Sequence, residues 1–402
     1  METILSDCLE GKGLSREEAV RLAATRGDEL AALLGAAAEL RDQHKGKTVT
    51  FSPKVFIPLT NLCRDFCGYC TFRKAPDEPG AKTMAIEEVL AVVRRGKALG
   101  CTEVLFSLGD RPEAVYGEMR VFLAQLGLKR TLDYLYEACK AVLEETAMLP
   151  HSNPGIMGKG DLRRLKQVNV SLGLMLENVS ERLLQPGGPH FDAPDKKPEL
   201  RLRTIAEAGK LRIPFTTGIL IGIGETWEER VDSLIAIREL NQRYGHIQEV
   251  IIQNFRAKPE IPMRDHPEPS FEEMLKTIAL ARIILGGEMN IQAPPNLTPD
   301  SYPLYLSAGI NDWGGVSPLT PDYINPEAPW PELVSLIRKT AEAGFMLRAR
   351  LPIYPEFISR GETFIPPSLV SYVERLCDAD GLVKRELSPL PPTAMTEARL
   401  PG

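Results

Sequence analysis

Three cysteines on one short segment are the residues of this 402-residue sequence best suited to metal chemistry. They occur in IPLTNLCRDFCGYCTF as Cys63-x3-Cys67-x2-Cys70, and thiolates spaced this closely can converge on one soft metal centre. A structural zinc site usually takes four ligands in two separated pairs, and the sequence has no second pair. Three ligands on a cluster of four irons would leave one iron open to bind another molecule. We therefore predict a 4Fe-4S cluster. A zinc site completed by a remote histidine and three unligated buried thiols are the alternatives.

Two further stretches place an acidic residue directly after an apolar run. Gly109 and Asp110 follow the run 103–107, and Glu177 closes the run 169–176. If these runs are parallel strands, their carboxyl ends meet at the edge where α/β barrels carry their chemistry. A role in ligand binding is therefore expected. An ordinary turn at Gly109-Asp110 and a helix N-cap at Glu177 are the alternatives.

The elements that must position these residues alternate between short apolar runs and amphipathic stretches. Strands are predicted over 54–59, 103–107, 146–151, 169–176, 214–221, 247–254, 290–293 and 307–311. Helices are predicted over 86–99, 131–143, 161–167, 200–209, 227–242, 271–285 and 331–343. About eight repeats of strand and helix indicate an α/β protein with a parallel sheet, and we predict a closed (β/α)8 barrel.

Segments outside this alternation frame the barrel. Residues 1–48 are rich in Ala, Leu and Glu and predict an N-terminal helical extension. The barrel is expected over 49–345. Residues 346–402 hold many prolines and predict an irregular C-terminal extension with one helix over 367–376. The last dozen residues are expected to be poorly ordered.

Composition narrows the partners and the compartment. The net charge is −6, which argues against nucleic acid as a partner because no excess of cations could neutralise phosphates. No apolar run of 18 residues occurs, which argues against a membrane-spanning helix. The N-terminus lacks the basic and apolar regions of a secretory signal, and the seven cysteines are too sparse for a disulfide framework. We expect a reduced, cytoplasmic protein.

The cysteine spacing, with Tyr69 immediately before the third cysteine, resembles the signature of the radical S-adenosylmethionine (SAM) superfamily. The resemblance implies a TIM-type barrel and a 4Fe-4S cluster held by Cys63, Cys67 and Cys70. It also implies SAM bound to the open iron and a reducing electron donor. One electron would then cleave SAM to a 5′-deoxyadenosyl radical.

The resemblance further implies which residues surround SAM. Gly109-Asp110 is similar to the superfamily's Gly-acid pair, which binds the methionine amino group. Arg201 is similar to an arginine that pairs with the methionine carboxylate, and a shifted register would give this role to Arg203. GILIGIGE, residues 218–225, is similar to the superfamily's G-x-I-x-G-x-x-E segment, whose glycines let backbone approach the adenine. The cofactor-binding residues expected are Tyr69, Gly109, Asp110, Glu177, Arg201, Gly218, Gly222 and Glu225.

Longer stretches narrow the resemblance to one family. FSLGDRPE, LPHSNPGIM, QNFRAKPEIPM, QAPPNL and GINDWGGVSPLTPDYINPE closely resemble the CofG-type subunit family of FO synthase, over residues 51–329. FO is 7,8-didemethyl-8-hydroxy-5-deazariboflavin, a precursor of coenzyme F420. The resemblance implies closure of the deazaflavin ring with release of ammonia, methionine and 5′-deoxyadenosine. It also implies a CofH-type subunit, which would deliver the hydroxybenzyl adduct, as a functional partner.

The implied substrate carries a ribityl chain, a pyrimidine dione and a phenol, so uncharged hydrogen-bonding groups are expected at the strand ends. The substrate-binding candidates are Ser152, Asn153, Gln253, Asn254, Arg256 and Asn311. The candidates for taking the proton released with ammonia are Asp110, His151, His190 and Asp312. The residue pattern does not choose among these four.

Three rival functions stay open on the sequence. Two lie within the superfamily: the CofH-type partner and an enzyme similar to aminofutalosine synthase. Arg64-Asp65 within the cysteine loop and Thr71-Phe72 after it favour the CofG type. The third is a non-enzymatic iron-sulfur carrier, which would leave Arg201 and the segment 218–225 unexplained.

Overall fold

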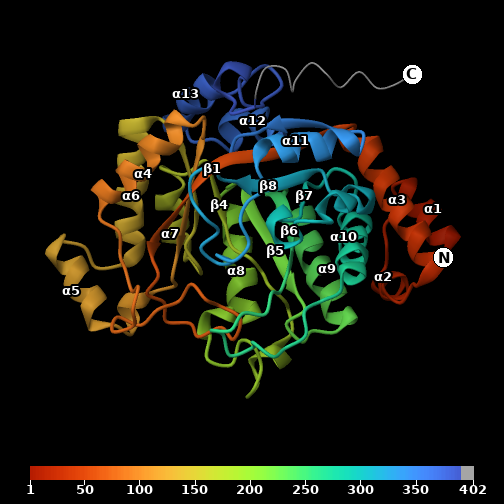
Figure 1. Cartoon of the computed structure of the whole chain (residues 1–402), viewed down its shortest axis with the longest axis horizontal. Coiled ribbons are helices and arrows are strands. Elements are labelled where there is room, and N and C mark those ends of the chain that lie inside the picture. The colour runs from red at the N-terminus through yellow and green to blue at the C-terminus, as the bar shows by residue number, and fades with distance from the viewer. Residues whose placement is uncertain (391–402) are drawn as a thin grey trace.

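The centre of the molecule is a closed barrel of parallel strands surrounded by helices (Figure 1). The computed structural model describes residues 1–390. Neighbouring strands pair in the order β2-β3-β4-β5-β6-β7-β8-β1, and β1 also pairs with β2, so the ring closes. The barrel strands are β1 (Thr48–Thr60), β2 (Glu103–Leu108), β3 (Leu149–Asn153), β4 (Ser171–Gly173), β5 (Phe215–Ile221), β6 (Ile247–Asn254), β7 (Ile291–Gln292) and β8 (Asp312–Val316). The predicted (β/α)8 barrel is confirmed.

A helical segment follows each strand and covers the outside of the barrel. Seven of these segments are the α-helices α4 (Ile86–Ala98), α6 (Thr131–Thr146), α7 (Lys159–Leu165), α8 (Pro198–Lys210), α9 (Trp227–Tyr244), α10 (Phe271–Leu285) and α11 (Leu333–Glu342). A 3-10 helix, Tyr302–Ala308, takes this place after β7, and α5 (Gly117–Gln125) is an addition between β2 and α6. The starts of α9 and α10 are fixed by capping boxes on Thr226 and Ser270.

The eighth strand was predicted in the wrong place. Residues 307–311 end the 3-10 helix and lead into β8, which begins only at Asp312. The strand was missed because it contains two glycines. A Cβ on Gly314 would lie 1.9 Å from the Gln292 side chain, and one on Gly315 would lie 2.0 Å from that of Lys54. Large side chains from β7 and β1 fill this part of the barrel, so β8 must be narrow there.

The N-terminal helices α1 (Glu2–Leu9), α2 (Arg16–Ala23) and α3 (Gly27–Lys45) pack on one side of the barrel (Figure 1). The α2 helix contacts α9, and α3 contacts α10. Their buried leucines join the same hydrophobic core as the barrel, as do apolar side chains of the C-terminal extension. The division at residues 48 and 345 stays a prediction, since this core is continuous across both positions.

The C-terminal extension adds strand β9 (Met346–Ala349), which pairs with β1 over Thr48 to Phe51. It continues into α12 (Pro355–Ile358) and α13 (Pro367–Leu376), the helix predicted at these residues. Between β9 and α12 the chain crosses the end of the barrel where the strands begin, because Ser171 and Gln248 both donate to the Pro352 carbonyl. The predicted poorly ordered tail lies outside the described residues. Among residues 1–390, no helix is long and apolar enough to cross a membrane.

Candidate active site

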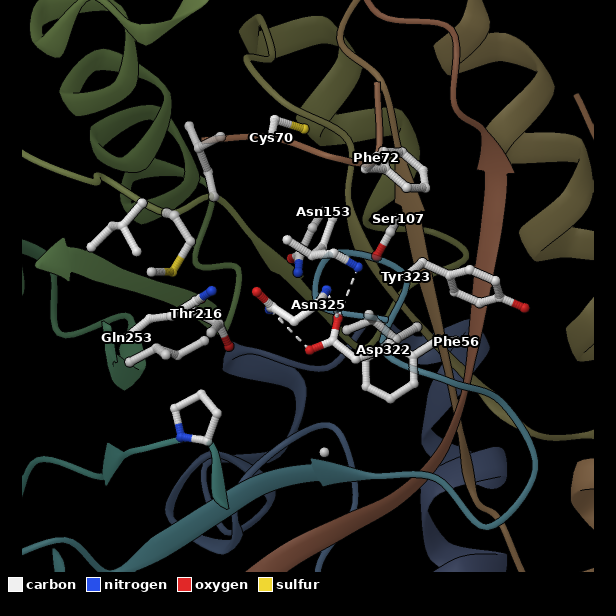
Figure 2. A pocket seen from close by; sticks show the side chains of 18 of the residues that line it. Phe56, Cys70, Phe72, Ser107, Asn153, Thr216, Gln253, Asp322, Tyr323 and Asn325 are labelled. Carbon is white, nitrogen blue, oxygen red and sulfur yellow. Dashed lines mark hydrogen bonds between the residues drawn. The ribbon is translucent and has the colours of Figure 1, made fainter. Parts of the chain in front are cut away.

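A cavity of about 360 Å³ runs inside the barrel from the cysteine loop to the C-terminal extension. Its lining includes the three loop cysteines near one end and Arg350 and Pro352 near the other. Side chains from several strands and from the loop after β8 point into this space (Figure 2). Asn153 from β3, Gln253 from β6 and Asn325 from the loop are among them.

The cysteine loop begins just beyond β1 and is held by backbone contacts. Phe66 N–H donates to the Asp192 carbonyl and Gly68 N–H to the Pro189 carbonyl, both at 2.8 Å. The end of β2 packs directly on the loop, where a Cβ on Gly109 would lie 2.0 Å from the Leu62 carbonyl oxygen. Gly109 is therefore required for contact between strand and loop, whatever binds beside it.

The three thiols fit a metal centre by their chemistry. All three are free and line the same cavity. The Cys63 sulfur accepts the backbone N–H groups of Asp65 at 3.4 Å and Asp110 at 3.2 Å, a pattern that stabilises a thiolate ligand. Burial raises the pKa of Cys63 to about 12 and that of Cys67 well above its ordinary value. A nearby positive charge is therefore needed to hold the thiolates, and a metal centre supplies one.

Charged side chains lie beside the loop. Lys196 Nζ lies 2.5 Å from Glu177 Oε1, and an Arg201 guanidinium nitrogen lies 3.9 Å from the same oxygen. Burial opposes ionisation of Glu177, but Lys196 and then Arg201 lower the pKa of this carboxyl below its ordinary value. Glu177 also has φ +65°, a strained backbone conformation for this residue type. The ammonium of Lys196 favours the Cys67 thiolate as well.

A second set of charged side chains lies next to Cys63. The carboxylates of Asp65, Asp110 and Asp195 have oxygens within 4.8 Å of one another. Arg64 binds both oxygens of Asp195 at 2.6 Å, and Arg111 also donates to Asp195. Two guanidinium groups therefore offset part of the negative charge of these three carboxylates, and both bind Asp195. Burial, and then the charge of Asp195, raise the pKa of Asp110 to about 7, and one buried oxygen of Asp110 has no hydrogen-bond partner among the described residues.

The structure brings most of the predicted site residues to one cavity. Besides the three cysteines, the cavity lining includes Tyr69, Gly109, Asp110, His151, Asn153, Glu177, Arg201, Gln253, Asn254 and Arg256. The predicted residues outside this lining are Ser152, His190, Gly218, Gly222, Glu225, Asn311 and Asp312. Arg203, the alternative to Arg201, lines a different pocket on the outside of the barrel.

Three substrate or proton-transfer candidates were misplaced by the sequence analysis. Ser152 points away from the cavity because side chains alternate along β3, and its hydroxyl donates to Asn169 at 2.7 Å. Asn311 and Asp312 lie where β8 begins, at the opposite end of the barrel from the cysteine loop. Asn311 binds Arg282, and Asp312 binds Arg350 at 2.6 Å. Both side chains are committed to the fold.

The residues of the segment 218–225 contact neighbouring protein atoms in this structure. A Cβ on Gly218 would lie 2.2 Å from the Ile251 carbonyl oxygen, and one on Gly222 would lie 2.4 Å from Pro269. The glycines therefore make room for neighbouring protein atoms, where the sequence analysis expected room for adenine. The Glu225 carboxylate accepts the N–H groups of Gly222 and Ile223 at 2.8 Å and pairs with Arg230. It fixes the turn after β5.

His190 lies outside the cavity lining and contacts Tyr69, which is part of that lining. Its Nε2 lies 3.0 Å from the hydroxyl of Tyr69, which itself lines the cavity. Burial lowers the pKa of His190 to about 3, so its ring is neutral at pH 7. This arrangement positions Tyr69, which lies within the cysteine loop between Cys67 and Cys70.

Several charged residues of the cavity were not predicted from the sequence. Among them are Lys54, Glu103, Lys196, Glu249 and Arg350. Lys54, Glu103 and Glu249 each interrupt an apolar run that forms a strand, and a charge at an inward position of a barrel strand is a usable signal. Lys196 and Arg350 carry no such signal, because each stands in an irregular segment that only the tertiary fold brings to the barrel.

Comparisons with known proteins agree with this geometry. The family model of the radical SAM superfamily matches residues 57–237. A 7,8-didemethyl-8-hydroxy-5-deazariboflavin synthase of Methanopyrus kandleri is 52% identical over 336 residues, which cover 84% of this chain and 100% of that protein. An FO synthase of Streptomyces avermitilis is 47% identical over 393 residues, 95% of this chain and 46% of that protein. This chain thus spans about half the length of the Streptomyces protein.

A solved structure supports the fold independently. HydG, a maturase of the [FeFe]-hydrogenase, matches with a TM-score of 0.72 at 18% identity, over 86% of this chain and 75% of that chain. At this identity the likeness concerns the fold alone. The 52% identity over a complete relative reaches further: the chain belongs to the FO synthase family of radical SAM enzymes.

Proposed function

We propose that this chain closes the deazaflavin ring of FO in coenzyme F420 biosynthesis. The proposed substrate is 5-amino-5-(4-hydroxybenzyl)-6-(D-ribitylimino)-5,6-dihydrouracil. The products are FO, ammonia, methionine and 5′-deoxyadenosine. The observation that carries the proposal is the 52% identity to a 7,8-didemethyl-8-hydroxy-5-deazariboflavin synthase over that protein's whole length.

The residues around the cysteine loop suit the two cofactors. Cys63, Cys67 and Cys70 would hold three irons of a 4Fe-4S cluster and leave the fourth open. When bound, the cluster would supply the one electron needed to cleave SAM to a 5′-deoxyadenosyl radical. Arg201 would bind the methionine carboxylate through its guanidinium group. The Asp110 oxygen that has no hydrogen bond within residues 1–390, and only an ion pair with Arg111 at 3.4 Å, would accept an N–H of the methionine amino group.

The rest of the cavity suits a polar substrate with aromatic rings. Phe56 and Trp330 stack with ring centroids 5.0 Å apart, and both line the cavity. Asn254 Oδ1 and Trp330 Nε1 are buried without a hydrogen-bond partner among residues 1–390. Buried polar atoms of this kind are costly unless a ligand or water satisfies them. A pyrimidine dione and a ribityl chain offer the donors and acceptors required.

The substrate would be made by a CofH-type subunit, and the electron would come from a separate reducing protein. The relatives support a division of labour: the Methanopyrus synthase is matched over its full length, whereas the Streptomyces FO synthase is matched over 46%. The unmatched part of the longer protein is large enough for a second barrel. Stable association with the partner is not required by this proposal, since the adduct can diffuse between active sites.

The test is anaerobic reconstitution of the chain with iron and sulfide, followed by reduction with dithionite and addition of SAM and the synthetic adduct. We expect 5′-deoxyadenosine by chromatography and a fluorescent deazaflavin that matches FO by mass. A reconstituted chain with about four irons that makes 5′-deoxyadenosine but no FO would refute the substrate assignment. One that makes neither would favour the iron-sulfur carrier.

A further inference from the structure

His151 is held at the centre of the barrel by a chain of short hydrogen bonds. Its Nδ1 lies 2.6 Å from the Ser171 hydroxyl oxygen. That oxygen lies 2.6 Å from the carbonyl oxygen of Pro352 in the C-terminal extension. The other ring nitrogen, Nε2, lies 3.0 Å from the side-chain oxygen position of Asn153. His151 and Asn153 line the cavity.

The number of hydrogens in this chain fixes the tautomer of the ring. A carbonyl oxygen can only accept, so the single hydroxyl hydrogen of Ser171 must point to Pro352. The contact between Nδ1 and the Ser171 oxygen then needs a hydrogen on Nδ1. In a neutral imidazole this leaves Nε2 with a free lone pair. The opposite tautomer would leave two oxygens 2.6 Å apart with no hydrogen between them.

Asn153 can satisfy Nε2 in both protonation states. The two ends of an amide are assigned from the hydrogen-bond network, and this side chain makes no other hydrogen bond to residues 1–390. Turned one way, its N–H donates to the lone pair; turned the other way, its oxygen accepts from a protonated Nε2. A Cβ on Gly173 would lie 2.0 Å from the Asn153 oxygen and 3.1 Å from Nε2. The absence of a side chain at Gly173 keeps this space open.

We propose that His151 Nε2 accepts the proton released as the deazaflavin ring closes, and that Ser171 and the Pro352 carbonyl are positioning groups that hold its tautomer. The inference rests on the proposed function and selects one of four candidate groups. The step is a proton transfer alone. A bond from the substrate to hydrogen breaks, its electron pair stays on the substrate, and an N–H bond forms at Nε2. The imidazolium then gives its proton to the departing ammonia, which leaves as ammonium.

The surroundings of His151 agree with a transient proton carrier. Burial lowers the pKa of the ring to about 4, so it is neutral at pH 7 and releases a proton readily. Three charged groups face it: Glu103 from β2, Lys54 from β1 and Arg350 from the C-terminal extension. Glu103 favours the imidazolium, whereas Lys54 and Arg350 oppose it. The other candidates are less suited, because the Asp110 carboxylate accepts the Ile156 N–H and pairs with Arg111, His190 binds Tyr69 and Asp312 is paired with Arg350.

The first experiment measures the tautomer without any turnover. The sequence has five histidines, so ¹⁵N-histidine labelling gives few signals, and His151→Gln identifies those of His151. We expect a protonated Nδ1 and an unprotonated Nε2 at pH 7. A protonated Nε2 with an unprotonated Nδ1 would overturn the proposal. Ser171→Ala removes the acceptor for Nδ1 and should let the other tautomer appear.

The second experiment separates proton transfer from radical formation by measuring FO and 5′-deoxyadenosine in the same reaction. His151→Gln should form 5′-deoxyadenosine within about threefold of the unaltered chain. It should form FO at least about 100-fold more slowly, the usual effect of losing a general base. The matched control is His44→Gln on α3, where the ring pairs with the exposed Glu288 and packs on Gly287; both products should be unchanged.

A third variant keeps the proposal testable if His151→Gln fails to fold. Asn153→Asp has the same shape but places a carboxylate beside Nε2, which raises the pKa of His151. The pH below which FO formation is lost should then move upward relative to the unaltered chain, while the yield of 5′-deoxyadenosine changes little. An unchanged ratio of FO to 5′-deoxyadenosine in both variants would refute the role of His151. If the unaltered chain makes no FO, the proposed function itself fails.

Discussion

The two ends of the barrel cavity each hold a cluster of charged side chains, and the clusters differ in how fully their polar atoms are hydrogen-bonded. The floor cluster consists of Glu249, Asp312, Arg350 and Tyr354, and the cysteine-side cluster consists of Arg64, Asp65, Asp110, Arg111 and Asp195. In the floor cluster Arg350 donates to Asp312 at 2.6 and 3.0 Å and to Glu249 at 2.9 Å, and Tyr354 also donates to Glu249 at 2.9 Å. No buried side-chain atom of this cluster lacks a partner within residues 1–390.

The cysteine-side cluster is incomplete by the same measure. One oxygen of Asp110 and the Nε of Arg111 are buried without a hydrogen-bond partner in the described part of the chain, and they form only a 3.4 Å ion pair with each other. Glu177 nearby has a strained backbone. Unsatisfied groups and strain concentrate where a protein binds ligands, and a barrel keeps its chemistry at the carboxyl ends of its strands and its stability at the other end. The comparison predicts that substitutions at the two ends will separate activity from stability.

The largest expected effect on activity comes from Cys67→Ala. Loss of one of three cluster ligands should abolish 5′-deoxyadenosine formation, a decrease of at least about 1,000-fold, because no open iron would then be held to bind SAM. The matched control is Cys139→Ala on α6, a fully buried cysteine that contacts Ser152 and Asn169. It should lose about 1 kcal/mol of unfolding free energy and keep its activity. Substantial 5′-deoxyadenosine from reconstituted Cys67→Ala would refute the cluster assignment.

The largest expected effect on stability comes from Arg350→Met in the floor cluster. The change leaves Glu249 and Asp312 buried without their cation, which costs about 3–5 kcal/mol of unfolding free energy. Urea denaturation measures it. Arg348→Met, two residues earlier in β9, breaks a pair with the more exposed Asp378 at 2.7 Å and should cost about 1 kcal/mol. Equal losses in both variants would show that the floor cluster does not stabilise the barrel as we infer.

Acid should destabilise the protein by similar amounts through two buried histidines, His151 inside the barrel and His190 beside Tyr69. Burial lowers the pKa of His151 to about 4 and that of His190 to about 3. Because the unfolded chain binds these protons first, near pH 6.5, stability is present above that pH and falls as the pH drops toward the folded values. Each histidine should account for roughly 2 kcal/mol of unfolding free energy lost between pH 7 and pH 5.

Urea denaturation at pH 7 and pH 5 tests this contribution. His151→Gln and His190→Gln should each reduce the pH dependence of the unfolding free energy by roughly 2 kcal/mol relative to the unaltered chain. Variants that keep the full pH dependence would show that these rings are not held neutral in the folded protein. A reduction in only one variant would mean that only that histidine is held neutral in the folded protein.

The sequence was a good guide to the cysteine side and a poor guide to the floor. The cysteine loop, Asp110 and Glu177 could be placed because each follows an apolar run that forms a strand, and strand ends gather at one edge. The floor depends on contacts between distant segments. Arg350 reaches Glu249 and Asp312 only because β9 joins β1, and no local pattern encodes that pairing. Asp312 was misplaced for a related reason. β8 contains glycines that make room for side chains of β1 and β7, and these glycines do not look like a strand in the sequence.

Trp330→Phe should have the smallest effect on stability and still change substrate binding. Trp330 Nε1 is buried without a partner within residues 1–390, and phenylalanine would keep the stack on Phe56 while removing this donor. The unfolding free energy should change by less than about 0.5 kcal/mol, since no hydrogen bond within the protein is lost. If the donor serves the substrate, the KM for the adduct should rise about five- to tenfold, the worth of one hydrogen bond, with kcat nearly unchanged.

The same substitution at Trp313 gives the contrasting control. Trp313 lies fully buried in β8, and its Nε1 donates to Thr340 at 3.1 Å. Trp313→Phe should therefore lower the unfolding free energy by about 1–3 kcal/mol, because it leaves a buried hydroxyl unpaired and a space unfilled, and it should leave the KM unchanged. An unchanged KM in Trp330→Phe would show that the unpartnered indole is not reserved for the substrate. The difference between the two ends would then lie in the charged groups beside the cysteine loop alone.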